Sequence, residues 1–220
     1  MADTLGTIRT KVKFELGNKS GIDQIIDDAI NDAIIEVIST WRPQEMVTSA
    51  TGSVANQTSS YSFSSIFSAT DVLAIIGVRN DTDDYRLKNG SLLEFMLAPT
   101  STTATNFGRP NKWTRQGNNL ILYSQIPDAT SRTIRIYYVQ RPAEITTDAT
   151  AFPLNREWER PVVLLAASYV WGALNNAEKA SLKDQQYQAT VLRRDKPEEI
   201  EDESPERQMW PMSNLSGGDF

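Results

Sequence analysis

The sequence predicts an α+β fold in which helices at both ends of the chain flank a central region of short strands. Apolar residues at spacings of three and four run from Ile22 to Trp41, the pattern of a long amphipathic helix. Short β-branched and aromatic runs fill residues 44–142 between clusters of Ser, Thr, Asn and Gly, as in strands joined by turns. A second helical pattern, apolar on almost every side, covers Val162–Leu174.

The first forty residues predict two helices. A short amphipathic segment over residues 5–16 can be capped by Thr4 and ends at Gly17, a common stop signal. The long helix follows, and Ser20 stands three residues before Asp23, a weak form of the capping box. Both helices carry an apolar side, so we expect them to pack against further helices.

The central region predicts five to six strands, about the usual number in one sheet. The candidates are Gln57–Phe67, Asp71–Val78, Tyr85–Leu87, Trp113–Arg115, Leu120–Tyr123 and Thr133–Val139. A hairpin turn at Asn118-Asn119 would join two of them, and Ser91 could cap a short helix that continues to Leu97.

The C-terminal part predicts two more helices and a tail. Pro161 fits the first turn of the apolar helix, and a more polar helix over 177–194 places Ala180, Tyr187 and Val191 on one face. Helix pairs from the two ends can close into a four-helix bundle if an antiparallel β lobe is inserted between them. We therefore expect bundle helices over 1–43 and 143–195, the β lobe over 44–142, and an extended C-terminal arm over 196–220.

Composition removes most catalytic chemistry. The 220 residues contain no cysteine and no histidine, which excludes disulfides, thiolate sites and catalytic triads that use histidine. We expect no cofactor and no metal site.

The net charge of −6 argues against tight, sequence-independent DNA binding and against a DNA-binding regulator. The longest apolar run is far shorter than the roughly 18 residues of a membrane span. No signal peptide is expected. The lack of cysteine fits a protein made in a reducing cytoplasm.

One candidate interaction surface is the polar side of the long N-terminal helix. Its acids are Asp23, Asp27, Asp28, Asp32 and Glu36. A metal or catalytic carboxylate pair is conceivable there, but we favour a solvated helix face whose early aspartates interact with the helix dipole. A third use is an interface in which these acids meet Arg or Lys of a neighbouring subunit.

The second candidate surface is the C-terminal arm. An acidic run precedes an apolar cluster, and a Trp flanked by Met is costly to expose unless it meets a partner. The proposed binding residues are Glu199, Glu201, Asp202, Met209, Trp210, Pro211, Met212 and Phe220. Trp113 and Trp158, in contrast, are expected in the core.

The order of elements and a series of short motifs resemble the head-to-tail adaptor proteins of tailed phages, especially short-tailed ones. The motifs are Tyr61, Gly108-x-Pro110-x-x-Trp113, Asn119-Leu120-Ile121-Leu122, Pro127-Asp128, Ile136-Tyr137-Tyr138 with Arg141-Pro142, and Pro153 with Trp158. The resemblance covers about residues 1–195.

The resemblance implies a structural virion protein and not an enzyme. Proteins of this family form a ring, usually of twelve copies, beneath the portal protein at the head vertex. Their helical bundle carries a β insertion that faces the next tail protein, a nozzle or tube, and a C-terminal arm that docks on portal subunits. Genome DNA passes through the ring without sequence-specific binding. This sequence lacks a basic arm, so its docking surface can differ in sign from that of some relatives.

Two alternatives stay open from sequence. One is a stopper or tail-completion protein. The other is a cell-wall hydrolase that uses two carboxylates, for which Glu94, between Leu93 and Phe95, is the acid in the most apolar setting.

Overall fold

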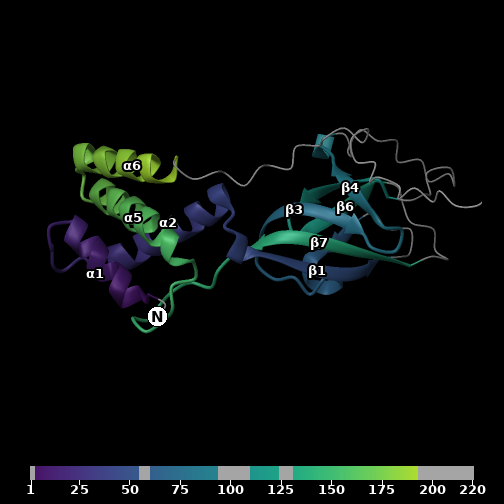
Figure 1. The fold of residues 1–220 in the computed structure, drawn as a ribbon, viewed down its shortest axis with the longest axis horizontal. Coiled ribbons are helices and arrows are strands. Elements are labelled where there is room, and N and C mark those ends of the chain that lie inside the picture. The colour runs from purple at the N-terminus through teal and green to yellow at the C-terminus, as the bar shows by residue number, and fades with distance from the viewer. Residues whose placement is uncertain (1–2, 55–59, 94–109, 124–130, 193–220) are drawn as a thin grey trace, which may run out of the picture.

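A computed structural model describes residues 3–54, 60–93, 110–123 and 131–192, and it has a helical part and a β part joined end to end (Figure 1). The helices are α1 (Leu5–Glu15), α2 (Asp23–Trp41), α3 (Phe63–Ile66), α5 (Glu159–Ala173) and α6 (Ala177–Val191), with short 3-10 turns at Gln44–Met46 and Arg156–Trp158. The strands are β1 (Val47–Val54), β2 (Ser60–Ser62), β3 (Val72–Asn80), β4 (Tyr85–Asn89), β5 (Lys112–Gln116), β6 (Asn119–Tyr123) and β7 (Arg132–Gln140). The predicted α+β class is confirmed.

The four long helices share one hydrophobic core, and α5 contacts the other three. This explains why α5 is apolar on almost every side, since neighbours cover most of its surface. Pro161 lies in its first turn, where the backbone N–H has no partner within the helix, as predicted. The side chains of Tyr187 and Val191 on α6 are buried, as the spacing predicts.

Two local predictions about helix ends are wrong. The long helix α2 begins after Ile22, and no side chain caps it, so the capping box expected at Ser20 does not form. Thr4 precedes α1 but its hydroxyl does not cap the helix either. The N-terminus of α1 is held instead by backbone: the Leu5 N–H donates to the Thr150 carbonyl at 3.0 Å.

The β part is a seven-stranded sheet in the order β1-β7-β3-β4-β5-β6-β2. Strand β3 pairs with β4, and the predicted hairpin is confirmed as β5–β6, although its turn lies at Gly117-Asn118, one residue earlier than predicted. Gly117 has a φ of 57°, a left-handed conformation that glycine adopts without strain. Strand β1 is an addition that the sequence patterns did not predict.

The expectation of a wholly antiparallel lobe is wrong at one pairing, because β4 and β5 are parallel. Parallel neighbours need a long connection that returns the chain to the same end of the sheet. The 22 residues between Asn89 and Lys112 supply that length. Of the short helix predicted over 91–97, Leu92 and Leu93 are helical and Ser91 is not, and residues 94–97 lie outside the described residues.

The helix α3 joins the two edges of the sheet. Strand β2 runs directly into α3, and α3 packs against β1 at the opposite edge of the strand order. The approach is close at Gly52 on β1, where an added Cβ would lie 2.7 Å from the Ile66 carbonyl oxygen and 2.8 Å from the Phe67 ring. The sheet therefore curls around a second hydrophobic core that includes Trp113 and Tyr61.

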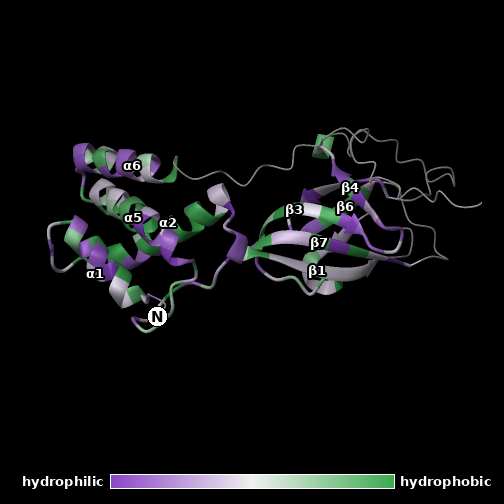
Figure 2. Ribbon diagram, viewed as in Figure 1, coloured by the Kyte–Doolittle hydropathy of each residue, from purple (hydrophilic) through white to green (hydrophobic). Residues whose placement is uncertain are grey.

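Strands β3 and β7 belong to both cores. Along β7, Tyr138 packs in the core of the β part, whereas its neighbour Val139 packs in the helical core. The pairing of β3 with β7 shifts register at two places, between Val72 and Ala74 and between Ile75 and Gly77. The residues at these two shifts, Leu73 and Ile76, pack their side chains against the helices. Bulges turn side chains toward a new face, and the apolar end of β3 next to the helices is visible in Figure 2.

Candidate interaction surfaces

The acids of α2 divide into two groups. Asp27 accepts two hydrogen bonds from Arg9 on α1, from Nε at 2.6 Å and from Nη2 at 2.7 Å, and Arg9 also pairs with Asp148 at 2.6 Å. Asp23 pairs with Lys13 at 2.6 Å. These two acids therefore hold α1 against α2 within one subunit.

The other three acids, Asp28, Asp32 and Glu36, follow at intervals of four residues and are exposed. Residues four apart lie on one side of a helix, so they form a continuous acidic stripe. Asp28 accepts a hydrogen bond from Gln24 at 2.8 Å, but in the described part of the chain none of the three lies within an ion pair. Of the five predicted acids, these three remain available to a partner.

The acidic stripe extends across the helices to Tyr169 on α5, which is 37% exposed. Burial raises the pKa of Tyr169 to about 12, and the charges of Glu36, Asp32 and Asp184 contribute in the same direction. The pKa of Tyr187 is also raised, first by burial, although a hydrogen bond from Trp41 opposes the shift. Tyr169 therefore lies within electrostatic reach of two acids of the stripe, Asp32 and Glu36.

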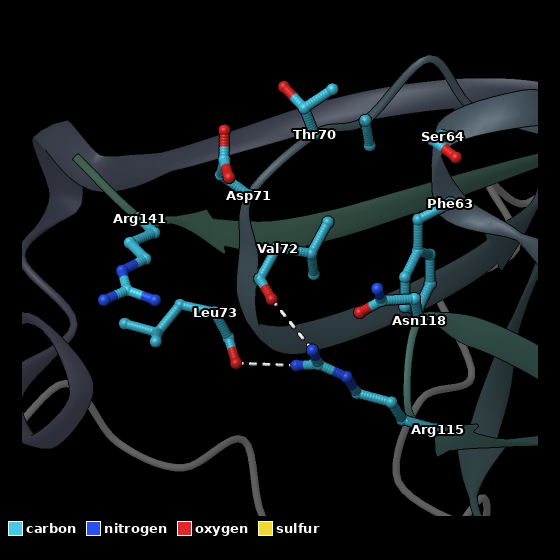
Figure 3. A pocket seen from close by; sticks show the side chains of 10 residues that line it. Phe63, Ser64, Thr70, Asp71, Val72, Leu73, Arg115, Asn118 and Arg141 are labelled. Atoms are coloured by element: carbon cyan, nitrogen blue, oxygen red, sulfur yellow. Dashed lines mark hydrogen bonds between the residues drawn. The ribbon is translucent and has the colours of Figure 1, made fainter. Parts of the chain in front are cut away.

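The β part has a pocket of about 480 Å³ at the start of β3 (Figure 3). Arg115 from β5 reaches across it and donates to the carbonyls of Leu73 at 2.6 Å and Val72 at 2.9 Å, with its guanidinium 5.7 Å from the centre of the Phe63 ring. Arg141, which follows β7, also lines the pocket. Arg115 thus links the β5–β6 hairpin to the strand that packs on the helices.

This pocket does not fit a two-carboxylate hydrolase. Among the described residues Asp71 is the one carboxylate that lines it, whereas glycosidic hydrolysis needs two. Asp71 and Ser68 both have positive φ angles, 56° and 51°, which is a strained conformation for these residues. Glu94, the acid noted for this alternative, lies outside the described residues. Within the described ranges no group of three Asp or Glu side chains is placed to hold a metal ion.

The predicted aromatic residues divide as follows. Trp113 and Trp158 are 5% and 7% exposed, so their prediction as core residues is confirmed. Trp158 lies 6.4 Å from Trp41, centroid to centroid, at the base of the helical core. The proposed binding residues of the arm, from Glu199 to Phe220, lie outside the described residues. The role of Arg115 was missed, and the only sequence signal was a basic residue beside a hairpin turn.

These observations describe a chain with three exposed acids along one side of α2 and a separate β part. The chain belongs to the SU10 adaptor protein family, which it matches over residues 3–209. The resemblance to phage head-to-tail adaptors is therefore confirmed, and membership implies a structural role in the virion. No curated protein matches the chain significantly. None of the described helices is both long enough and apolar enough to span a membrane.

Proposed function

We propose that this chain is the subunit of a ring that joins the portal at the head vertex to the tail, with genome DNA passing through the ring without sequence-specific binding. The observation that carries the proposal is the family match, which covers residues 3–209 and therefore both the helical part and the β part. In this proposal the helices form a four-helix bundle and the body of the ring.

The proposed ring contact uses the acidic stripe. Asp28, Asp32 and Glu36 are exposed and face no cation among the described residues of their own subunit, so they are suited to meet Lys or Arg of a neighbour. Asp23 and Asp27 serve the subunit itself and are expected to affect the ring only through α1 packing. Charge complementarity of this kind mainly sets the partner choice and the association rate.

The β part is proposed to be an inserted lobe that faces the next tail protein. Residue Val47 of β1 pairs with Val139 of β7, so the chain enters and leaves the lobe on adjacent strands. This supports an insertion over 44–142 between helices over 1–43 and 143–195. The arm, residues 196–220, is proposed to dock on portal subunits through Trp210 and its neighbours.

The test is electron microscopy of the purified protein with and without its portal. We expect a monomer or small oligomer alone and a ring, of about twelve copies, on the portal. A stable ring without the portal would contradict templated assembly. Failure to bind the portal, together with binding to an assembled tail end, would indicate a stopper or tail-completion protein instead.

A further inference from the structure

A second groove lies on the helical part, between the end of α1 and the start of α6. It has a volume of about 430 Å³, and the side chain of Trp171 forms part of its lining. Phe14 and Leu182 line it while 74% and 52% exposed, which is unusual for large apolar side chains on a folded surface. These side chains give the groove an apolar wall that is open to another segment.

The groove has a positive rim. The ammonium groups of Lys19 and Lys179 lie 4.6 Å and 4.4 Å from the centre of the Trp171 ring, and neither belongs to an ion pair among the described residues. Lys183 and Arg160 share the single carboxylate of Glu15. Four cations and one described acidic partner therefore gather at this end of a chain whose net charge is −6.

The chain contains one segment with the complementary chemistry. Residues 198–206 carry six carboxylates, and Met209-Trp210-Pro211-Met212 follows after Arg207 and Gln208. An acidic run with an apolar anchor matches an apolar groove with a cationic rim in both charge and hydrophobicity. No basic cluster interrupts the acidic run, so its charge acts as one block.

The segment is long enough to reach the groove of its own chain. Residues 193–208 can span up to about 50 Å when extended. The helix from Leu192 back to Lys179 is only about 20 Å long. A tethered segment also has a millimolar effective concentration, so weak contacts suffice to keep it bound.

We propose that, in the subunit free of portal, residues 198–212 occupy this groove of the same chain, with Trp210 against Phe14 and Leu182 and the carboxylates against Lys19 and Lys179. The contact goes beyond the proposed function, because it is a property of the isolated subunit. It has one consequence for assembly. A portal must displace the segment from the groove before the portal can bind the arm. The apparent affinity for the portal therefore equals the intrinsic affinity multiplied by the fraction of arms that are free.

The contact can be tested on the full-length protein with a zero-length carbodiimide reagent, which joins amines to carboxylates in direct contact. Cross-links from Lys19, Lys179 or Lys183 to residues 198–206 are expected, at higher yield than from Lys88, an exposed lysine of β4. Yields at the groove lysines no higher than at Lys88 would overturn the proposal. Mixing isotope-labelled and unlabelled protein distinguishes cross-links within one chain from cross-links between two chains, because only the latter join a labelled to an unlabelled peptide. A majority of cross-links between chains would overturn docking within one chain.

A charge-reversal variant provides an independent test. Lys179→Glu should lower cross-linking at Lys19 and Lys183 several-fold, and a second change, Glu201→Lys, should restore it. Folding should be retained because a carboxylate in the first turn of α6 is favoured by the helix dipole, and helical circular dichroism checks this. Lys88→Glu is the matched control. Unchanged cross-linking at Lys19 and Lys183 would contradict the proposal.

Failure of this inference and failure of the portal proposal give different results. If the arm docks on the portal, Lys179→Glu should speed portal association relative to Lys88→Glu, because the arm is free more of the time. Absent cross-links with intact portal binding would reject only the groove contact. Present cross-links without portal binding would reject only the proposed partner.

Discussion

Glu15 shows how individual charges hold the helices together. Burial acts to raise its pKa, but hydrogen bonds from Lys183, with Nζ 2.6 Å from Oε2, and from Arg160 outweigh burial and lower the pKa below the usual 4.5. The carboxylate lies at the end of α1, while its partners come from α6 and α5. One ionised side chain therefore joins three helices.

The first prediction concerns the pH dependence of this contact. Because the folded-state pKa is lowered, the stabilisation is present above the unfolded pKa of 4.5 and is lost as pH falls through the folded value. Glu15→Gln should therefore lower the free energy of unfolding at pH 7 by about 1 kcal/mol, with a difference from the wild type that shrinks below pH 4.5. Urea unfolding at several pH values measures it. Glu144→Gln, at an exposed acid, is the control, and an equal, pH-independent loss in both variants would contradict the role of Glu15.

The second prediction uses Tyr169 as a reporter of the acidic stripe. Negative charges raise the pKa of a phenol, so Asp32→Asn with Glu36→Gln should move the Tyr169 pKa from about 12 toward 10. The shift should be partial because burial, the larger cause, remains. Ultraviolet titration measures it, with Tyr169→Phe to identify the signal. Asp28→Asn, one turn away, should leave the pKa in place, and an unchanged pKa in the double variant would show that the stripe does not reach Tyr169.

At the scale of elements, the packing of α3 on β1 closes the β part. Gly52 permits this approach because a side chain there would overlap Ile66 and Phe67. The contact joins strands that no ladder of hydrogen bonds connects, since β1 and β2 are the two ends of the strand order. Edge strands are prone to pair with other chains, and α3 covers this gap.

The third prediction follows from that close approach. Gly52→Ala should destabilise the protein by about 1–3 kcal/mol, since α3 must move to admit the methyl group. Gly172→Ala is the matched control, because an added Cβ in α5 meets nothing within 4 Å, and alanine there should be neutral or stabilising. Thermal melting compares the two variants. A Gly52→Ala protein as stable as the wild type would show that α3 is free to shift.

At the scale of the whole molecule, the two cores meet on shared strands. Leu73, Ile76 and Val139 send side chains into the helical core, while Arg115 holds the start of β3 from the other side. Asn31 of α2 adds a polar contact, because its side chain accepts from the Ile145 N–H at 2.9 Å and donates to the Ile145 carbonyl at 3.1 Å. The β part is thus positioned by packing as well as by its connections.

The fourth prediction concerns deletion of the proposed lobe. Replacing Gln44–Pro142 by a short flexible linker should leave the helices folded, with a lower melting temperature because the apolar contacts of Leu73, Ile76 and Val139 are lost. The shortened protein should still attach to heads and fail to recruit tails. Circular dichroism and cosedimentation measure these two properties. Complete loss of helical signal would show that the helices cannot fold without the β part.

The fifth prediction concerns the arm. Trp210→Ala should weaken portal binding by about 2–4 kcal/mol if this side chain is the anchor, and should leave the melting temperature nearly unchanged. Cosedimentation with portal rings and thermal melting measure the two effects. Charge reversal at Glu199, Glu201 or Asp202 should act mainly on the association rate and its salt dependence. Unchanged portal binding in Trp210→Ala would reject the anchor, and a large drop in melting temperature would place Trp210 in the core.

The sequence by itself determined the elements whose patterns are local. Apolar patterns located α2, α5 and α6 to within a few residues, a short continuous apolar run located β3, and alternation located β7. The core positions of Trp113 and Trp158 were also predicted. The absence of His and Cys limited the chemistry, and the order of short motifs pointed to the adaptor family.

The tertiary structure decided what depends on distant partners. Strand β1, with the sequence VTSATGSV, has little apolar alternation and exists because it pairs with β7, with partners from Val54–Arg132 to Val47–Val139. The division of the α2 acids was equally hidden, since Asp27 and Asp32 look alike in sequence but only Asp27 meets Arg9. Long-range pairing and ion-pair geometry arise from the packing of whole elements, which no local period records.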